Sequence, residues 1–288
     1  MQLQNILFPV DFSERCQAVA PFVQSLAKRY GATVTLLHAI PPAPALYMDM
    51  GAVYPDAFDP TPVAGILESR LRTFAAEQFP HMKTICTVLD GDPARVIVEF
   101  ARNNSMDLIA LPTHGYGLFR RALVGSVTAK VLHDSPVPVW TDAHACEPSH
   151  RAHPQPRRVV AAIDLKERTG RTLETALAIA SDAGAAVDIL HITPEGFGSP
   201  LISEMQVEKA VATAAAGNAV VVERETTKDV QIVTEGESIA SVVRRVAVLK
   251  RADLVVIGRG SLQGNLLERL HAHTYSVICE SPCPVLSV

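Results

Sequence analysis

The segment Leu111–Thr128, LPTHGYGLFRRALVGSVT, combines glycines and hydroxyl side chains in a pattern that suits the binding of a phosphate group. Gly115 frees the backbone, Gly125 places a small residue at a predicted helix start, and Ser126 and Thr128 add hydroxyls there. Backbone N–H groups at the start of a helix attract anions, because the first turn leaves them without acceptors. The segment therefore predicts that the chain binds a phosphorylated small molecule.

Two predicted elements flank this segment and would hold it in place. MDLIAL, just before it, is a short apolar run of the kind found in buried strands, and RALVGSVTAKVLHD has helical spacing. We predict a strand over Asp107–Leu111 and a helix over Phe119–His133. A strand that passes through a glycine-rich loop into a helix is a common setting for an anion site.

The chain contains two copies of one unit. Four pairs of segments match in order along the two halves: ILFPVDFS with VVAAIDLK, VTLLHAI with VDILHIT, MDLIALPTHG with ADLVVIGRGS, and DSPVPVW with ESPCPVL. In this alignment Asp11 matches Asp164, and His38 matches His191. The second half is therefore a shorter repeat of the first.

Each copy alternates predicted strands with predicted helices. The strands of the first copy are expected near Asn5–Val10, Thr33–Ala39, Lys83–Leu89, Asp107–Leu111 and Val137–Thr141. Its helices are expected near Ser13–Tyr30, Pro62–Phe79, Pro93–Asn103 and Phe119–His133. The second copy repeats the strands near Arg158–Ile163, Ala186–His191, Val230–Thr234, Asp253–Ile257 and Pro284–Val288. This alternation predicts, in each copy, a parallel sheet covered by helices on both faces.

Length, charge and hydropathy limit the possible partners. The chain has 288 residues, 48% of them hydrophobic, which is enough for two domains at 1–142 and 158–288 with a proline-rich polar linker over 143–157. The formal charge is −4 and the cations form no sustained stripe, so we expect no nucleic acid partner. No apolar run approaches the ~20 residues of a membrane span, and the start lacks a secretory signal. We therefore expect a cytoplasmic protein with no membrane partner.

The topology predicts where Asp11 lies. In an open parallel sheet, ligands bind beyond the carboxyl ends of the strands, where the strand order reverses. If the first and fourth strands flank that point, Asp11 meets the loop Leu111–Thr128. A carboxylate beside an anion site suits a ribose hydroxyl or a phosphate-bound Mg²⁺. The alternative is that Asp11 only caps the first helix.

The first half resembles a universal stress protein domain. The ATP-binding members of that family carry Gly, two residues, Gly, nine residues, Gly, and then Ser or Thr. Here Gly115, the nine residues Tyr116–Val124, Gly125 and Ser126 keep this spacing, whereas Pro112 stands at the first glycine. Proline fixes φ and has no N–H, so it removes a donor or a positive φ if the site needs either. The resemblance implies two tandem flavodoxin-like (Rossmann-like) α/β domains, each with a five-stranded parallel sheet.

The resemblance also implies roles for individual residues. Pro9 and Asp11 would border the ribose, and the backbone of Ala39 would contact the adenine. The remaining nucleotide-binding residues would be the strand end and the phosphate loop, namely Leu111, Pro112, Gly115, Gly125, Ser126, Val127 and Thr128. In the second half Gly258 restores the first glycine, but Ser261, His271 and Ala272 replace Gly115, Gly125 and Ser126. We expect that copy not to bind nucleotide in the same way.

Other signals carry less weight. His271, His273, Cys279 and Cys283 match no standard zinc spacing, so we expect no metal held by protein clusters. The five cysteines are expected to be reduced thiols. His38 and His191 occur in both copies, which favours a structural role over catalysis. The loop Pro41–Thr61 is long enough to form a lid, a partner surface or a disordered excursion.

We therefore expect a regulatory tandem universal stress protein that binds ATP or another adenine nucleotide, with Mg²⁺, in its first domain. Edge strands at PVPVW and PCPVLSV would pair the two halves as an intramolecular pseudo-dimer or form a homodimer. The alternative is a stress adaptor that acts through protein contacts without nucleotide, and a third possibility is a transferase or hydrolase. The sequence indicates no catalytic residues, because no general base lies beside a placed nucleophile, so at most a slow ATPase is expected.

Overall fold

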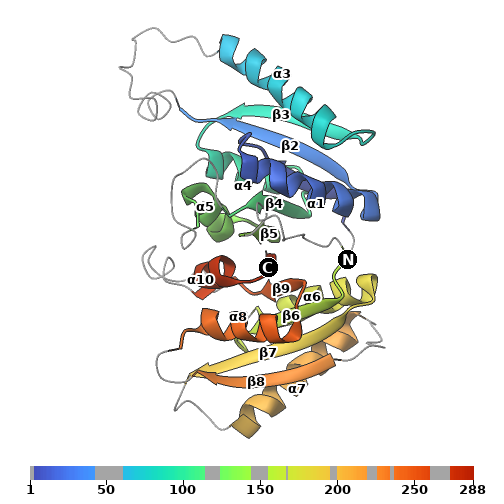
Figure 1. The fold of residues 1–288 in the computed structure, drawn as a ribbon, viewed down its shortest axis with the longest axis vertical. Helices are drawn as coiled ribbons and strands as arrows, with labels where there is room; N and C mark the ends of the chain where they lie inside the picture. The colour runs from blue at the N-terminus through green and yellow to red at the C-terminus, as the bar shows by residue number, and fades with distance from the viewer. Residues whose placement is uncertain are drawn as a thin grey trace. The chain divides into compact units, whose positions relative to one another are not determined.

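The computed structural model describes residues 3–42, 61–113, 124–143, 155–166, 168–194, 200–218, 226–233, 237–259 and 273–288. The chain divides into two compact units: the amino-terminal unit contains Gln2–Gly117 and Gly125–Val139, and the carboxy-terminal unit contains Trp140–Val288. Both are α/β structures, and each is described by itself (Figure 1). Among the described helices, none combines the length and hydropathy needed to cross a membrane.

The amino-terminal unit alternates strands and helices as predicted. Its elements are β1 (Asn5–Pro9), α1 (Glu14–Tyr30), β2 (Thr33–Ile40), α3 (Thr61–Gln78), β3 (Thr84–Asp90), α4 (Pro93–Asn103), β4 (Leu108–Pro112) and α5 (Ser126–Asp134). The boundary with the next unit falls inside β5 (Val139–Asp142), after Val139. The strand order is β3-β2-β1-β4-β5. The described pairings of β1 with β2, β1 with β4 and β2 with β3 are all parallel. Helix α1 packs against α3, and α4 packs against α5.

The carboxy-terminal unit repeats this plan. Its elements are β6 (Arg158–Ile163), α6 (Thr169–Ala183), β7 (Ala186–Pro194), α7 (Pro200–Asn218), β8 (Thr226–Val233), α8 (Ile239–Lys250), β9 (Leu254–Ile257), α10 (His273–Glu280) and β10 (Val285–Ser287). The strand order, β8-β7-β6-β9-β10, is the same as that of the first unit when each strand is replaced by its repeat. The alanine-rich segment forms α7, and β8 begins before the predicted Val230.

The repeat extends to individual hydrogen bonds. Asp107 Oδ2 accepts from the backbone N–H groups of Gln4 and Asn5 at 2.7 and 2.8 Å, which ties the start of β1 to the start of β4. Asp253 Oδ2 accepts from the two equivalent N–H groups, at 2.7 and 3.0 Å. In each sheet, a carboxylate that accepts from two backbone N–H groups therefore holds the starts of two neighbouring strands together.

The helix ends and the core follow from the sequence. Ser13 caps α1, because its side chain accepts from the N–H of Cys16, and Gly31 ends the helix with a φ of 66°. The ring of Phe8 is fully buried between α3 and the sheet, with its centroid 6.4 Å from that of Phe74 and 5.9 Å from that of Phe79. This apolar core holds β1, and with it the end of the strand that carries Asp11.

Candidate functional site

The order of the strands reverses between β1 and β4, and this brings two predicted site segments to the same edge of the sheet. Leu7 of β1 pairs with Ile109 of β4, so both strands run the same way and end close together at Pro9 and Pro112. Ligands of open parallel sheets bind at such a reversal. The predicted meeting of Asp11 with the end of β4 therefore follows from the observed topology.

A tight turn holds Asp11 at the end of β1. Its Oδ1 accepts from the N–H of Ser13 at 2.9 Å and from the Ser13 hydroxyl at 2.7 Å. Phe12 between them has a φ of 62°, in the left-handed region that non-glycine residues rarely adopt. Ser13, rather than Asp11, caps α1. Within the described residues Oδ2 of Asp11 takes no hydrogen bond, so one carboxylate oxygen remains for another partner.

The same turn occurs in the carboxy-terminal unit, which shows that it belongs to the scaffold. Leu165 has a φ of 58°, and Asp164 Oδ1 accepts from the N–H of Lys166 at 3.0 Å and from the hydroxyl of Thr169 at 3.4 Å. The aspartate therefore orders the strand-to-helix turn in both copies. Any ligand contact made by Asp11 is additional to this structural role.

The two ends of the glycine-rich loop are fixed by hydrogen bonds. Gly125 N–H donates to the carbonyl of Thr113 at 2.8 Å, and the Thr128 hydroxyl donates to the carbonyl of Pro112 at 3.1 Å. Thr128 is buried, and its hydroxyl braces the end of β4. Pro112 forms the last residue of that strand. Gly115 lies outside the described residues.

Helix α5 starts later than the predicted Phe119. Val124 and Gly125 are not helical, and the helix begins at Ser126 with Gly125 as its N-cap. No side chain caps this end, so the N–H groups of the first turn, at Ser126, Val127 and Thr128, have no intrahelical acceptor. Helical spacing alone does not locate the start, because LFRRAL keeps the same apolar period. The exposed start of α5 thus lies just beyond the end of β4, where an anion would be stabilised.

A buried nitrogen near this edge also lacks an acceptor. Arg15, in the first turn of α1, has an Nη1 atom that is inaccessible to solvent and has no hydrogen-bond partner among the residues that the structure describes. A buried guanidinium N–H without an acceptor is costly, and an anion would satisfy it. No motif or spacing in the sequence identifies this residue.

The end of β2 presents backbone groups beside the end of β1. Val10 N–H donates to the carbonyl of Leu37 at 2.8 Å, so Leu37 faces β1. Ala39 lies two residues further along β2, and because a strand repeats every two residues, its backbone N–H and C=O point to the same side, beyond the last residue of β1. The predicted adenine contact at Ala39 is therefore compatible with the backbone geometry.

The imidazole of His38 has a structural role at the ends of β1 and β2. Its Nδ1 lies 2.6 Å from the carbonyl of Val10, so this nitrogen carries the proton and donates. Its ring centroid is 4.8 Å from that of Phe12, and the guanidinium of Arg70 lies 4.2 Å from the Phe12 ring centroid. His191 makes the equivalent bond to Ile163 at 3.0 Å, which confirms the predicted structural role.

Comparison with known proteins now decides the family. The model of the universal stress protein family matches residues 2–141 and again 156–288. The chain belongs to the universal stress protein family. A universal stress protein of Synechocystis sp. is 32% identical over 139 residues, which cover 48% of this chain and 85% of that relative.

Solved universal stress proteins share the fold. One from Archaeoglobus fulgidus has a TM-score of 0.74 at 22% identity, with 98% of this chain and 95% of that chain covered. Another, with 20% identity and a TM-score of 0.38 over 46% of this chain, is a universal stress protein in complex with cAMP. Family membership supports a role in the stress response.

The second copy of this universal stress protein differs at the equivalent edge. A side chain at Gly258 would meet the hydroxyl of Thr172 at 3.0 Å and Arg168 Cβ at 3.4 Å, so α6 closes on this backbone. The next residue, Arg259, is buried, and its pKa is lowered to about 10 by burial and by the nearby Arg168 and Arg171. Ser261, His271 and Ala272 lie outside the described residues. The arginines are a feature that the sequence analysis did not identify.

Cys16, Cys279 and Cys283 of this universal stress protein are protonated thiols at neutral pH. Burial raises the pKa of Cys16 to about 12, that of Cys279 to about 11 and that of Cys283 to about 12. In the described part of the chain, no group of three His, Cys, Asp or Glu side chains is arranged to hold a metal ion.

The partly buried position of His38 predicts a pH dependence of stability. Burial lowers the pKa of His38 below its ordinary value of 6.5, so the unfolded chain binds a proton that the folded chain excludes. The stabilisation is complete above pH 6.5 and is lost as the pH falls toward the folded-state pKa. The free energy of unfolding, measured with urea, should fall more from pH 7 to pH 5 in the native chain than in His38→Asn. The same fall in the free energy of unfolding for both proteins would contradict this prediction.

Proposed function

We propose that the amino-terminal unit binds ATP or a related adenine nucleotide, with Mg²⁺, and that nucleotide occupancy regulates a role in the stress response. One observation carries the proposal. The strand reversal gathers Asp11, the uncapped start of α5 and the free backbone of Ala39 at one edge of the sheet, in the copy that keeps the family's glycine spacing.

The phosphates would occupy the start of α5. The N–H groups of Ser126, Val127 and Thr128 supply donors, and Gly125 at the N-cap leaves room for close approach. The buried Nη1 of Arg15 adds a cation that needs an acceptor. Proline at position 112 is compatible with this arrangement, since the residue acts as the end of β4 and its carbonyl is already bonded to Thr128.

Asp11 would supply the oxygen ligand. Its Oδ1 is committed to Ser13, which fixes the orientation of the carboxylate, and Oδ2 is available for a ribose hydroxyl or for Mg²⁺. Magnesium usually takes one or two carboxylates and completes its shell with phosphate oxygens and water. A single carboxylate beside a triphosphate therefore suits a metal that arrives with the nucleotide. When bound, Mg²⁺ would neutralise part of the phosphate charge.

The base would lie along the end of β2. The N–H and C=O of Ala39 offer one donor and one acceptor, the combination that the edge of adenine requires. Pro9 ends β1 next to this position and would border the ribose. We propose slow hydrolysis at most, because His38 holds its proton toward Val10 and acts in the scaffold.

Regulation would follow from differential affinity. A ligand shifts a conformational equilibrium only as far as it binds one state better than another. The loop between β4 and α5 is tied at both ends, by Thr113 to Gly125 and by Pro112 to Thr128. Nucleotide at the start of α5 would therefore favour one conformation of the amino-terminal unit, which a cytoplasmic partner would recognise.

The test is direct. The chain is purified, denatured and assayed for released adenine nucleotide, and a nucleotide-free sample is then titrated with MgATP by calorimetry. We expect bound nucleotide or a saturable heat with one site per chain. No nucleotide and no heat at millimolar ATP would overturn the proposal and leave the nucleotide-independent adaptor as the function to pursue.

A further inference from the structure

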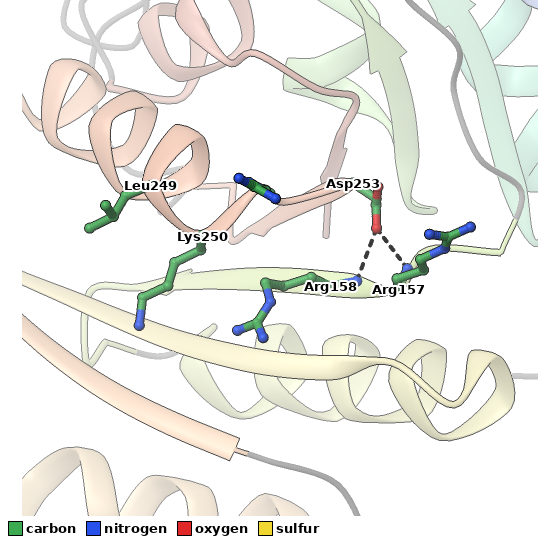
Figure 2. A pocket seen from close by; sticks show the side chains of 6 residues that line it. Arg157, Arg158, Leu249, Lys250 and Asp253 are labelled. Carbon is green, nitrogen blue, oxygen red and sulfur yellow. Dashed lines mark hydrogen bonds between the residues drawn. The ribbon is translucent and has the colours of Figure 1, made fainter.

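A pocket of about 590 Å³ lies in the carboxy-terminal unit, at the side of its sheet where β6 and β9 begin. It is lined by Arg157, Arg158, Leu249, Lys250, Arg251 and Asp253 (Figure 2). Its volume falls in the range of small-molecule sites. Cationic side chains dominate its wall, which is unusual for a chain of net negative charge.

Two of the cations are held in place by one buried carboxylate. Asp188 on β7 is 1% exposed, and it pairs with Arg158 Nη1 at 2.9 Å and with Lys250 Nζ at 3.2 Å. Figure 2 shows the side chains of Arg158 and Lys250 extending in the same direction. The long side chains are thus ordered before any ligand arrives, which reduces the entropy lost on binding.

The other two cations are available to a ligand. Arg157 and Arg251 are exposed, and neither guanidinium makes a hydrogen bond or ion pair with any residue that the structure describes. Their backbones are nevertheless fixed. Asp253 Oδ2 accepts from the N–H of Arg157 at 2.7 Å, and Arg251 ends α8 with a φ of 54°. The pocket therefore offers two fixed and two free cations against the carboxylates of Asp188 and Asp253.

The first copy shows that the fold does not require this charge. The equivalent positions there are neutral, namely Gln4 and Asn5 at the start of β1, Asn104 and Ser105 after α4, and the buried Thr35 in place of Asp188. The backbone is the same, since Asp107 makes the same pair of bonds and Ser105 has a φ of 49°. These cations occur only in the second copy. The shared fold therefore does not explain them.

We propose that this pocket binds a small oligophosphate, either inorganic or as a phosphate ester. Guanidinium groups bind phosphate oxygens in a bidentate manner, and a ligand with adjacent phosphates would reach Arg157 and Arg251 together with the anchored pair. Leu249, which is 75% exposed at the rim, provides an apolar contact for an organic group on an ester. Monoanions would bind weakly, because they cannot engage separate cations at once.

The test uses inorganic tripolyphosphate and the full-length chain in calorimetry at low salt. We expect one site, with an affinity at least tenfold lower in the double variant Arg157→Gln/Arg251→Ser. Those replacements introduce residues that the first copy carries at the same backbone positions, so the fold is expected to persist, and thermal unfolding checks this. The control Arg102→Gln/Lys209→Gln removes two exposed cations outside the pocket and should keep the native affinity.

Further arms separate the alternatives. Tripolyphosphate binding must survive in Gly125→Val, since loss there would locate it at the start of α5 and overturn the proposal. Equal weakening by the control variant would reduce the effect to overall charge and would also overturn it. Hexaglutamate that binds as tightly as tripolyphosphate would assign the pocket to acidic peptides instead. Comparing tripolyphosphate with ribose 5-triphosphate distinguishes an inorganic ligand from an ester. An ester is favoured if Leu249→Ser weakens the binding of ribose 5-triphosphate and leaves that of tripolyphosphate unchanged.

Discussion

Replacing Gly125 with valine is expected to weaken ATP binding by about 100-fold, or about 2.7 kcal/mol. Gly125 has φ −59° and ψ 149°, which any residue adopts, so the backbone tolerates the change. The branched side chain would stand at the N-cap of α5, in front of the N–H groups of Ser126 and Val127. The loss therefore arises from blocked access to these donors. Calorimetry with MgATP measures it.

The matched control lies in the second copy. Ala272→Val places the same bulk near the position equivalent to Ser126, in a unit that we expect not to bind nucleotide in this way. Binding should remain close to that of the native chain. An equal loss in both variants, or no loss in Gly125→Val, would remove the start of α5 from the site. Thermal unfolding of each variant separates loss of binding from loss of structure.

Replacing Asp188 with alanine is expected to lower the free energy of unfolding by about 3 kcal/mol. The carboxylate is 1% exposed and neutralises Arg158 and Lys250, whose side chains are 29% and 24% exposed. Without it, these two partly buried cations would lose the counter-charge that they share. Their partial exposure places the cost at the lower end of the range for a broken buried ion pair. Urea denaturation followed by circular dichroism measures it.

The first copy supplies the compensating variant. Asp188→Thr combined with Arg158→Asn and Lys250→Asn installs the residues found at Thr35, Asn5 and Asn104. Removal of all three charges should recover most of the stability, because the penalty comes from unpaired charge and not from a missing contact. A triple variant as unstable as Asp188→Ala would show that the carboxylate acts through other contacts.

Most of the fold could be predicted from the sequence, because the patterns that indicate strands and helices are local and occur in both halves. Apolar runs gave the strands, and the match of the two halves predicted one topology for both. Ser13 and Gly31 marked the ends of α1 correctly. The start of α5 was missed because the apolar spacing continues upstream of Ser126, whereas the helix itself stops at the N-cap formed by Gly125.

The chemistry of individual groups was harder to predict. The hydroxyl of Thr128 donates to Pro112, a contact that depends on how α5 docks against β4. The basic pocket is assembled from two short segments, at 157–158 and 250–251, over a carboxylate at Asp188. A scan for a continuous basic stripe does not detect such a cluster, because the sheet brings together residues far apart in the chain.

The buried thiols have a consequence for the kind of stress to which the chain can respond. At neutral pH, a thiol with a pKa of about 11, as at Cys279, is ionised in roughly one molecule in 10,000. Oxidants attack the thiolate, so Cys16, Cys279 and Cys283 are poor targets for peroxide. These three residues are therefore poor receivers of an oxidative signal.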